Sequence, residues 1–438
     1  YLSEQVFEHL PEDIRQFLIE TAALPAFNHS LLEAVLGGRE HADLSERLAE
    51  YALPVTLLAG PGNWMRFHPV FNEFLKKTAS RRGVDANLAL NRAAHWFEAQ
   101  GDVDRAVHHA LLAGDANLAA RIVETAGGWR RIYATTRGGA TLFQALSARA
   151  SEIDLVRFPL VTLGLSIFNA KAAQLAAANH YLVIAERAAA GDAILAKDLR
   201  VVRILLALYT DHWASSADLS ALEDDLRQPD GMELIHRALA LNMLSYNFLI
   251  RSELDRALHY GHQATRAFRD GGADFGAMHL YTHVGQAFFL SGDCASALSS
   301  YEELISEAQA NIGSGSDFDA VGQVLKAEVL SMRGEVDVAA EILKWALPHL
   351  ELHDTWFDLL AAGFMAEQRV LRMREDLLAA HAAMDRIRAV ARRRGFDRLT
   401  RLIDGERAML LMGSGDLDQA IRHAEASGFG MQAIVSDR

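Results

Sequence analysis

Apolar residues recur every three to four positions through most of the chain, and this spacing predicts helices that each bury one face. Helical spacing begins in residues 3–36, with a restart at Pro11, where a helix tolerates proline best. The pair Gly37-Gly38 stops this region, because glycine ends helices easily. A further helix is expected from about Leu44 to Tyr51. The first part of the chain is therefore predicted to be a small group of helices.

The spacing then changes to the alternation that is typical of β-strands. Val55–Leu58 and Trp64–Phe67 flank a turn, Gly60-Pro61-Gly62-Asn63, and together they predict a two-stranded hairpin. A new helical pattern starts directly after His68-Pro69 and ends in a basic run. Helices followed by a hairpin and a closing helix describe a winged helix, which we assign to residues 1–82.

From residue 83 to residue 438 a recurring sequence motif replaces this arrangement. An apolar helix ends at a glycine, an acid follows, and an alanine stands five residues after the glycine; the glycines are Gly101, Gly114, Gly292, Gly334 and Gly415, with looser copies at Ser252 and Arg374. The glycine permits a left-handed turn, the acid favours the start of the next helix, and the alanine lets two helices approach closely. The spacing of about 40 residues is tetratricopeptide-like.

These repeats predict an all-α chain in which residues 83–438 form a superhelix of about eight or nine helix pairs. The copies are degenerate between residues 129 and 226, although helical spacing continues there. Residues 312–317, rich in glycine and serine, are expected to form a flexible loop.

Composition narrows the possible functions. A formal net charge of -14 argues against gripping a phosphate backbone, which needs clustered Lys and Arg. The single cysteine, Cys294, is expected to be a buried apolar residue. No apolar run approaches the roughly 18 residues that span a bilayer, and the start lacks a signal region, so we expect a cytoplasmic protein without membrane contact. Because the chain starts without Met on a helical pattern, we expect it to be part of a longer polypeptide.

Three stretches carry a resemblance to a known family. They are Tyr1–Val6 with Arg15–Leu18, the block Trp64–Leu75 that joins an aromatic-His-Pro element to a Phe-x-x-Phe-Leu helix, and residues 95–115. The chain resembles the large ATP-dependent LuxR-type transcriptional regulators of the MalT kind, which are signal-transduction ATPases. The likeness is strong up to about Glu124 and lies only in the architecture afterwards.

The resemblance implies a nucleotide-binding module before the winged helix, a superhelix that senses an inducer, and a C-terminal helix-turn-helix that reads DNA. This chain has no Gly-x-x-x-x-Gly-Lys-Ser/Thr phosphate loop, and residues 426–438 lack a basic recognition helix. We therefore expect the middle of a regulator, a fragment without a cofactor or an enzymatic activity of its own. ATP and ADP would bind to the full-length parent, which would hydrolyse ATP slowly as a switch and self-associate on activation.

His68 is the candidate for sensing nucleotide. In related ATPases a winged-helix histidine at this place touches the β-phosphate of ADP, so the resemblance implies that role here. An imidazole can donate a hydrogen bond to that phosphate if the fold presents it to the neighbouring module. The alternative is that His68 caps the closing helix or packs beside Phe67. Both interpretations stay open at this point.

The concave wall of the superhelix is the expected inducer site, since pockets between helices hold ligands. Counting from the glycine turns places six side chains on that wall: Asn242, Tyr246, His279, Thr282, Gln286 and Phe289. Such polar and aromatic groups suit a small polar molecule or a peptide. The alternative is that they are ordinary solvated residues of a groove.

Two pairs of histidines lie one helical turn apart, His279 with His283 and His349 with His353. This spacing suits zinc, but the sequence offers no His-Glu-x-x-His motif and no evident third ligand, so no metal site is predicted. No catalytic template is present either. The run Arg392-Arg393-Arg394 is interpreted as a helix end, with contact to a neighbouring domain as the alternative.

Two functions remain open. The first is the inducer-sensing and coupling segment of a transcriptional regulator, whose partners are the inducer, its own ATPase and helix-turn-helix domains, and DNA only through the latter. The second is a free-standing tetratricopeptide scaffold that docks protein tails. The flanking coding sequence decides between them, because only the first requires a phosphate loop upstream and a helix-turn-helix downstream.

Overall fold

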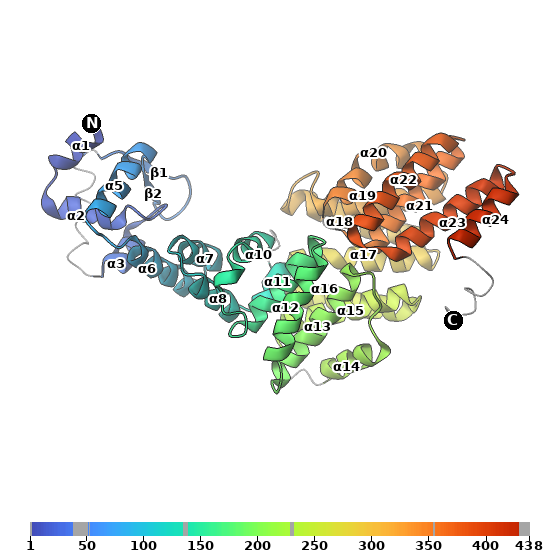
Figure 1. The fold of residues 1–438 in the computed structure, drawn as a ribbon, viewed down its shortest axis with the longest axis horizontal. Helices are drawn as coiled ribbons and strands as arrows, with labels where there is room; N and C mark the ends of the chain where they lie inside the picture. Colours follow the sequence, from blue (N-terminus) through green and yellow to red (C-terminus); the bar gives the residue numbers. More distant parts are fainter. Residues whose placement is uncertain are drawn as a thin grey trace. The chain divides into compact units, whose positions relative to one another are not determined.

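The computed structural model describes residues 2–37, 51, 53–134, 139–227, 232–353 and 355–428. It confirms the all-α fold class, since the regular elements of the described residues are helices apart from one two-stranded hairpin (Figure 1). Two compact units are present, residues 1–128 with 144–161, and residues 129–143 with 162–438. The boundary expected after residue 82 falls inside the first unit.

The first unit begins with the predicted winged helix. Its elements are α1 (Leu2–Glu8), α2 (Glu12–Thr21), α3 (His29–Leu36), β1 (Val55–Leu57), β2 (Met65–Phe67) and α5 (Pro69–Arg81). The strands are antiparallel and pair Val55 with Phe67. Pro11 precedes α2, and Gly37 ends α3 in a left-handed conformation, as predicted. The helix expected at residues 44–51 lies outside the described residues except for Tyr51.

Three short helices continue the first unit: α6 (Ala86–Ala99), α7 (Val103–Leu112) and α8 (Ala116–Thr125). The Arg92 side chain donates a 2.7 Å hydrogen bond to the carbonyl of Val35 at the end of α3. In the wing, Trp64 stacks on Phe97 of α6, with ring centroids 5.8 Å apart, and the Arg105 guanidinium lies over both rings. These contacts explain why the structural boundary lies beyond the winged helix.

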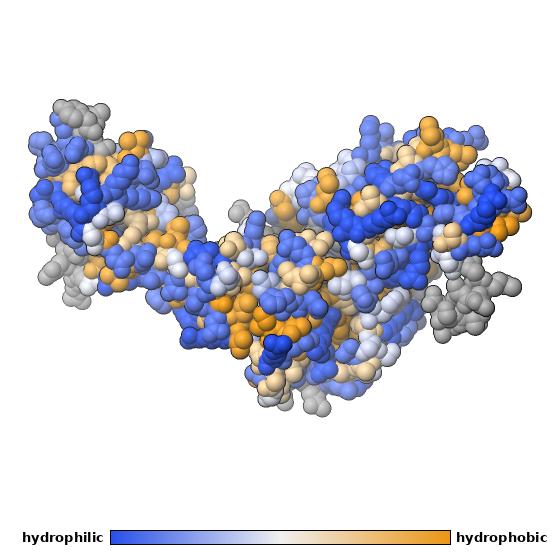
Figure 2. Space-filling view, viewed as in Figure 1, coloured by the Kyte–Doolittle hydropathy of each residue, from blue (hydrophilic) through white to orange (hydrophobic). Residues whose placement is uncertain are grey.

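The second unit is the predicted array of helix pairs. Its helices are α9 (Arg131–Ala134), α11 (Pro159–Lys171), α12 (Leu175–Ala188), α13 (Ala193–Tyr209), α14 (Ser216–Arg227), α15 (Leu234–Ile250), α16 (Leu254–Asp270), α17 (Asp274–Leu290), α18 (Cys294–Asn311), α19 (Asp317–Met332), α20 (Val336–Leu352), α21 (Phe357–Met373), α22 (Leu377–Arg394), α23 (Asp397–Gly413) and α24 (Leu417–Ala426). Helix α10 (Ala140–Ser147) spans both units, and the first three residues of α11 also belong to the first unit. From α15 onward each helix packs on the next, and the first helices α15, α17, α19, α21 and α23 also contact one another in order. They form an inner layer. Figure 2 shows hydrophilic residues over much of the visible face of α20 and α22, while most of the buried residues of these two helices are apolar.

The turn chemistry of the repeats is confirmed. Glycines 101, 114, 292, 334 and 415 all have φ between 75° and 90°, and the alanine five residues after each is buried. At the copies without glycine, Ser252 and Glu375 adopt the same left-handed conformation, with φ of 59° and 60°. A residue with a Cβ loses roughly 1 kcal/mol there relative to glycine. Packing therefore fixes the turn even where the sequence does not favour it.

The same conformation reveals two repeats in the degenerate stretch. Ala173 and Asp211, both with φ of 58°, follow α11 and α13 at spacings that continue the series. From α11 to α24 there are seven helix pairs, and α6 with α7 gives an eighth within the described residues. The expected number of eight or nine agrees with this.

Close approach inside a pair depends on small residues. A Cβ built on Gly285 of α17 would lie 2.3 Å from the ring of Tyr301 on α18, so only glycine fits there. Tyr301 is fully buried as a result.

Two local expectations need correction. Cys294 is only half-buried, because it occupies the first turn of α18, where side chains point partly toward solvent. The loop of residues 312–317 is held by hydrogen bonds: the buried carboxylate of Asp319 accepts from the backbone N–H of Gly315 at 2.8 Å and from the side chain of Gln309 at 3.2 Å. Asp319 therefore anchors this loop, which was expected to be flexible.

Candidate effector pocket

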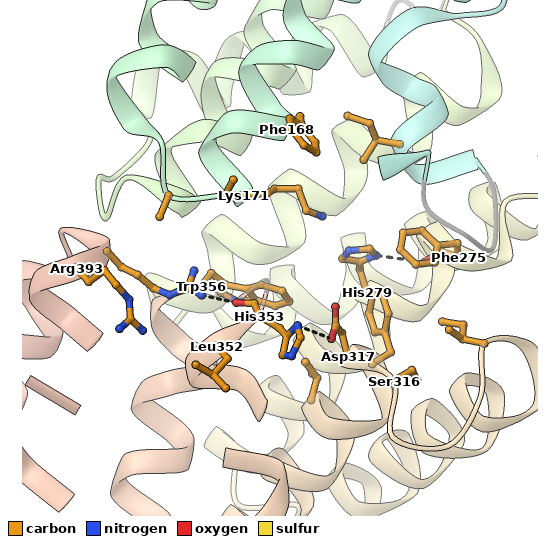
Figure 3. Close-up of a pocket in the computed structure, with 17 residues that line it drawn as sticks. Phe168, Lys171, Phe275, His279, Ser316, Asp317, Leu352, His353, Trp356 and Arg393 are labelled. Carbon is orange, nitrogen blue, oxygen red and sulfur yellow. Dashed lines mark hydrogen bonds and ion pairs between the residues drawn. The ribbon is translucent and has the colours of Figure 1, made fainter. Parts of the chain in front are cut away.

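A pocket of about 770 Å³ opens within the second unit (Figure 3). It is lined by residues of α9, α11, α17, α19, α20 and α22 and by the loops next to them. Phe168 and Lys171 of α11 face the opposite wall, which carries His279 and Trp356. Its size falls in the range of small-molecule sites, roughly 300–1,000 Å³. Residues far apart in the sequence therefore build one cavity.

The walls of the pocket are mostly apolar and aromatic. The apolar lining residues are Ile132, Phe168, Ala172, Ala173, Phe275, Ile312, Phe318, Val321, Leu352 and Trp356. Phe275 and Phe318 meet edge to face with centroids 5.2 Å apart. Such a surface favours binding of the apolar part of a ligand, because binding removes the apolar surfaces of both the pocket and the ligand from water.

Cationic groups stand among these apolar walls. Lys171, Arg393 and Arg394 line the pocket, against the single carboxylate of Asp317. The Lys171 ammonium lies 5.8 Å from the ring centroid of Tyr133. Arg393 donates to the carbonyl of Glu351 at 3.0 Å, and Arg394 donates to the carbonyl of His353. In a chain with a net charge of -14 this local excess of positive charge favours an anionic ligand.

His279 lies at the centre of the aromatic wall. Its ring packs against the rings of Phe275, Phe318 and Tyr133 at centroid distances of 5.4, 4.7 and 5.6 Å. Burial lowers the pKa of His279 to about 3, with a further contribution from the positive charge of Lys171. The imidazole is therefore neutral at physiological pH, and because its Nδ1 lies 3.2 Å from the carbonyl of Phe275 and donates to it, Nε2 is left as a hydrogen-bond acceptor.

The other predicted inducer residues lie elsewhere on the inner layer. Asn242, Tyr246, Thr282 and Gln286 are buried, Phe289 is half-buried, and none of the five belongs to the described lining of this pocket. The expectation of an open, solvated wall is thus wrong for the four buried residues, because side chains of neighbouring repeats cover them. A role of these residues in binding stays a prediction.

A packed cluster closes that part of the inner layer. The Tyr246 hydroxyl donates to Asp358 of α21 at 2.5 Å, and the Tyr246 ring lies 5.2 Å from that of His283. Arg398 of α23 forms an ion pair with Asp211, whose carboxylate also accepts from the Arg398 backbone N–H at 2.8 Å. Asp211 thereby satisfies a free N–H in the first turn of α23.

His68 is exposed and immediately precedes α5. Its backbone N–H donates to the carbonyl of Pro54, and its own carbonyl accepts from Asn72. Within the part of the chain that the structure describes, its side chain makes no capping hydrogen bond to α5. The capping alternative is therefore wrong for the side chain, and contact with nucleotide stays a prediction.

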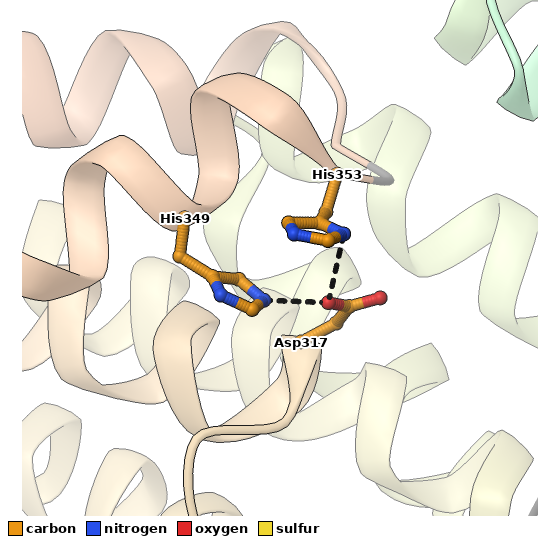
Figure 4. A group of neighbouring side chains, drawn as sticks. All are labelled: Asp317, His349 and His353. Atoms are coloured by element: carbon orange, nitrogen blue, oxygen red, sulfur yellow. Dashed lines mark hydrogen bonds and ion pairs between the residues drawn. The ribbon is translucent and has the colours of Figure 1, made fainter.

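The two histidine pairs differ sharply. His279 and His283 are buried, and burial lowers the pKa of each to about 3. His349 and His353, by contrast, meet the carboxylate of Asp317, with His349 Nε2 2.7 Å from Asp317 Oδ1 (Figure 4). The expectation that neither pair has a third ligand nearby is therefore wrong for the second pair. The carboxylate comes from another helix, 32 residues earlier in the chain.

Several pocket residues carried no signal in the sequence. Phe168 and Lys171 come from the degenerate stretch, where the repeat register could not be counted. Trp356 lies in a connection between helix pairs. The basic run gave a partial signal, since Arg393 and Arg394 line the pocket while Arg392 does not.

Among the described helices, none is long and apolar enough to cross a membrane.

Comparison with known proteins supports the resemblance. Residues 3–87 match the family model of the MalT winged helix domain. The chain is 34% identical over 132 residues to the HTH-type transcriptional regulator MalT of Vibrio parahaemolyticus, covering 30% of this chain and 14% of that protein. It is 32% identical over 161 residues to MalT of Vibrio cholerae, covering 36% of this chain and 17% of that protein. The chain thus spans only a small part of these relatives.

A solved structure has a similar fold. It is the crystal structure of a Signal Transduction ATPase with Numerous Domains (STAND) protein with a tetratricopeptide repeat sensor from Pyrococcus horikoshii. The likeness has a TM-score of 0.55 and 14% identity, over 97% of this chain and 64% of that chain. At this identity it supports the helical repeat architecture alone. The chain is therefore MalT-like, with a winged helix domain of the MalT family over residues 3–87 and a tetratricopeptide-type helical superhelix after it.

Proposed function

We propose that this chain is the effector-sensing and coupling segment of an ATP-dependent, MalT-like transcriptional regulator, and that a small effector binds in the pocket of the second unit. The observation that carries this proposal is the cavity of about 770 Å³ to which six helices contribute. Because these helices belong to several repeats, a ligand that bridges them favours one curvature of the array over others. A ligand acts as a switch only if it binds one state better.

The lining indicates the chemistry of the effector. The aromatic wall around His279 suits an apolar or aromatic body, while Lys171 and Arg393 suit a carboxylate or another anionic group. We therefore propose a small organic anion. The neutral imidazole of His279 would accept one hydrogen bond at Nε2 from a donor group of the ligand, which would fix the orientation of the ligand.

The first unit supplies the coupling element in this proposal. Arg92 on α6 binds α3, and the stacked rings of Trp64 and Phe97 join the wing to the same helix. A movement of α6 would therefore carry the winged helix with it, and the two would move together as one rigid body. In the parent protein the winged helix would relay the signal to the ATPase module, with His68 toward ADP, and DNA would be bound by the helix-turn-helix domain. Self-association on activation and a cytoplasmic location belong to the same proposal.

A thermal-shift screen tests effector binding directly. Small organic anions are added to the chain, and a ligand that binds the folded form raises its apparent stability, by about 2.7 kcal/mol at a hundred times its dissociation constant. Arg393→Gln should weaken binding of a hit at least about 10-fold, which corresponds to the loss of a charge-assisted hydrogen bond.

Arg392→Gln is the matched control, since Arg392 is the neighbouring arginine and does not line the pocket. Equal effects of the two variants would contradict the placement of the site. In the full-length parent, the affinity for the effector should differ between the ADP-bound and ATP-bound states. The same affinity in both states would argue against a switch.

A further inference from the structure

We propose that Asp317, His349 and His353 form a binding site for a divalent transition-metal ion, with one coordination position open toward the pocket. The metal site itself does not depend on the proposed effector. Only the use of its open position by an effector rests on the proposed function.

The fold brings the three side chains together from two antiparallel helices. Asp317 is the first residue of α19, while His349 lies in the last turn of α20 and His353 directly follows this helix. Because α19 and α20 pack as a hairpin, the start of one meets the end of the other. The anchored loop before α19 fixes this start, because the Asp319 carboxylate accepts from the N–H of Gly315 and the Asp319 N–H donates to the Ser316 hydroxyl.

The distances suit a shared ion. Asp317 Oδ1 lies 2.7 Å from His349 Nε2 and 3.9 Å from His353 Nδ1. One ligand atom from each residue lies within 4.8 Å of the others. In tetrahedral zinc sites the metal-to-ligand distances are about 2.0–2.2 Å, so ligand atoms are separated by roughly 3.3–3.6 Å. Asp317 and His353 are exposed, and small rotations of their side chains bridge the difference (Figure 4).

The donor set defines the kind of ion. Two imidazole nitrogens and one carboxylate oxygen suit Zn²⁺ and neighbouring transition metals, whereas Ca²⁺ and Mg²⁺ prefer oxygen ligands. Three protein ligands leave a fourth position for an exchangeable molecule, as in open zinc sites. The two imidazole rings are stacked with centroids 4.2 Å apart, and one nitrogen of each ring, His349 Nε2 and His353 Nδ1, lies on the side of Asp317.

The open position would face the pocket. Asp317 and His353 line the pocket (Figure 3), whereas His349 is not among the lining residues. The nearby positive charges of Arg393 and Arg394 disfavour a bare cation, and a bound anion offsets this repulsion. The structure therefore suggests that the ion and an anionic oxygen of an effector occupy the pocket together.

The experiment is isothermal titration of the untagged chain with ZnCl₂, after treatment with a chelator and without any effector. One equivalent of Zn²⁺ should bind, and Co²⁺ should give the visible absorption of a four-coordinate site. His349→Ala, His353→Ala and Asp317→Asn should each weaken Zn²⁺ binding at least about 10-fold, because loss of even an outer-shell partner costs that much. Circular dichroism checks that each variant is folded.

His180→Ala is the matched control, since His180 is exposed on α12, away from the cluster. It should leave binding unchanged. The proposal would be overturned if the wild type did not bind Zn²⁺, or if Zn²⁺ binding survived in His349→Ala and His353→Ala. The three side chains would then be only a hydrogen-bonded cluster. A failed effector screen with intact Zn²⁺ binding would count against the proposed function alone.

Discussion

The inner layer of the superhelix is closed in one region and open in another, although both regions come from the same kind of helix. Around Tyr246 the side chains of α15, α17, α21 and α23 pack against one another and bury their polar groups. Around His279, one turn before His283 on α17, the wall is aromatic and faces a cavity. The same helix α17 therefore contributes to both regions.

The difference teaches that repeat register and accessibility are separate properties. Register places a residue on the inner layer, and this follows from helical spacing. Whether such a residue is accessible to solvent depends on the size of the side chains that pack over it from repeats distant in the sequence. Asp211 and Arg398, which bridge the closed region, are 187 residues apart. The packed region should thus respond to substitution through stability, and the open region through binding.

The largest expected effect is at the bridge of the closed region. Arg398→Met should lower the free energy of unfolding by about 3 kcal/mol, because it removes the charged partner of the buried Asp211 carboxylate and leaves only the backbone N–H of residue 398. Chemical denaturation measures this change. Arg333→Met, at an exposed ion pair with Glu335, is the control and should cost under about 1 kcal/mol. If both variants are equally stable, the bridge contributes nothing to the packed region.

Acid should weaken the array through its buried histidines. The folded-state pKa of His283 is about 3, below the ordinary value of 6.5, so folding excludes a proton that the unfolded chain binds. Its contribution to stability is complete above pH 6.5 and is lost as the pH falls toward 3. The cost at pH 5 is roughly 2 kcal/mol for one such group.

His283→Gln removes one of the three described buried histidines of the second unit whose pKa is lowered, His236, His279 and His283, so the loss of stability between pH 7 and pH 5 should shrink by about that amount relative to the wild type. His279, with its pKa near 3, should account for a similar share of the remainder. Thermal unfolding at the two pH values measures the slopes. An unchanged slope in His283→Gln, with the exposed His180→Gln as comparison, would show that His283 titrates normally in the folded chain.

The smallest expected change in stability is in the open region. Arg393 is exposed at the pocket, and Arg393→Gln should alter the free energy of unfolding by about 0.5 kcal/mol or less. The same denaturation experiment applies. A loss as large as that of Arg398→Met would mean that Arg393 holds the array together, and the contrast between the two regions would fail.

Much of this fold follows from short-range sequence rules. The winged helix and the turns at Gly292, Gly334 and Gly415 were predictable, since glycine and helical spacing act within a few residues. The repeats at Ala173 and Asp211 were missed because packing forces a left-handed turn on residues that do not favour it. The site was hardly predictable. Only His279 of the six inducer candidates lines the pocket, because a cavity depends on which distant side chains fail to fill it.

The bridge between Asp211 and Arg398 also bears on how the chain folds. Arrays of this kind generally gain stability from contacts between adjacent repeats, so folding can start at any repeat and spread. A contact across 187 residues adds a loop closure whose entropic cost must be met before it stabilises anything. The second unit should consequently reach its full stability only after α23 has been synthesised, and it should then unfold as one cooperative body instead of fraying from its ends.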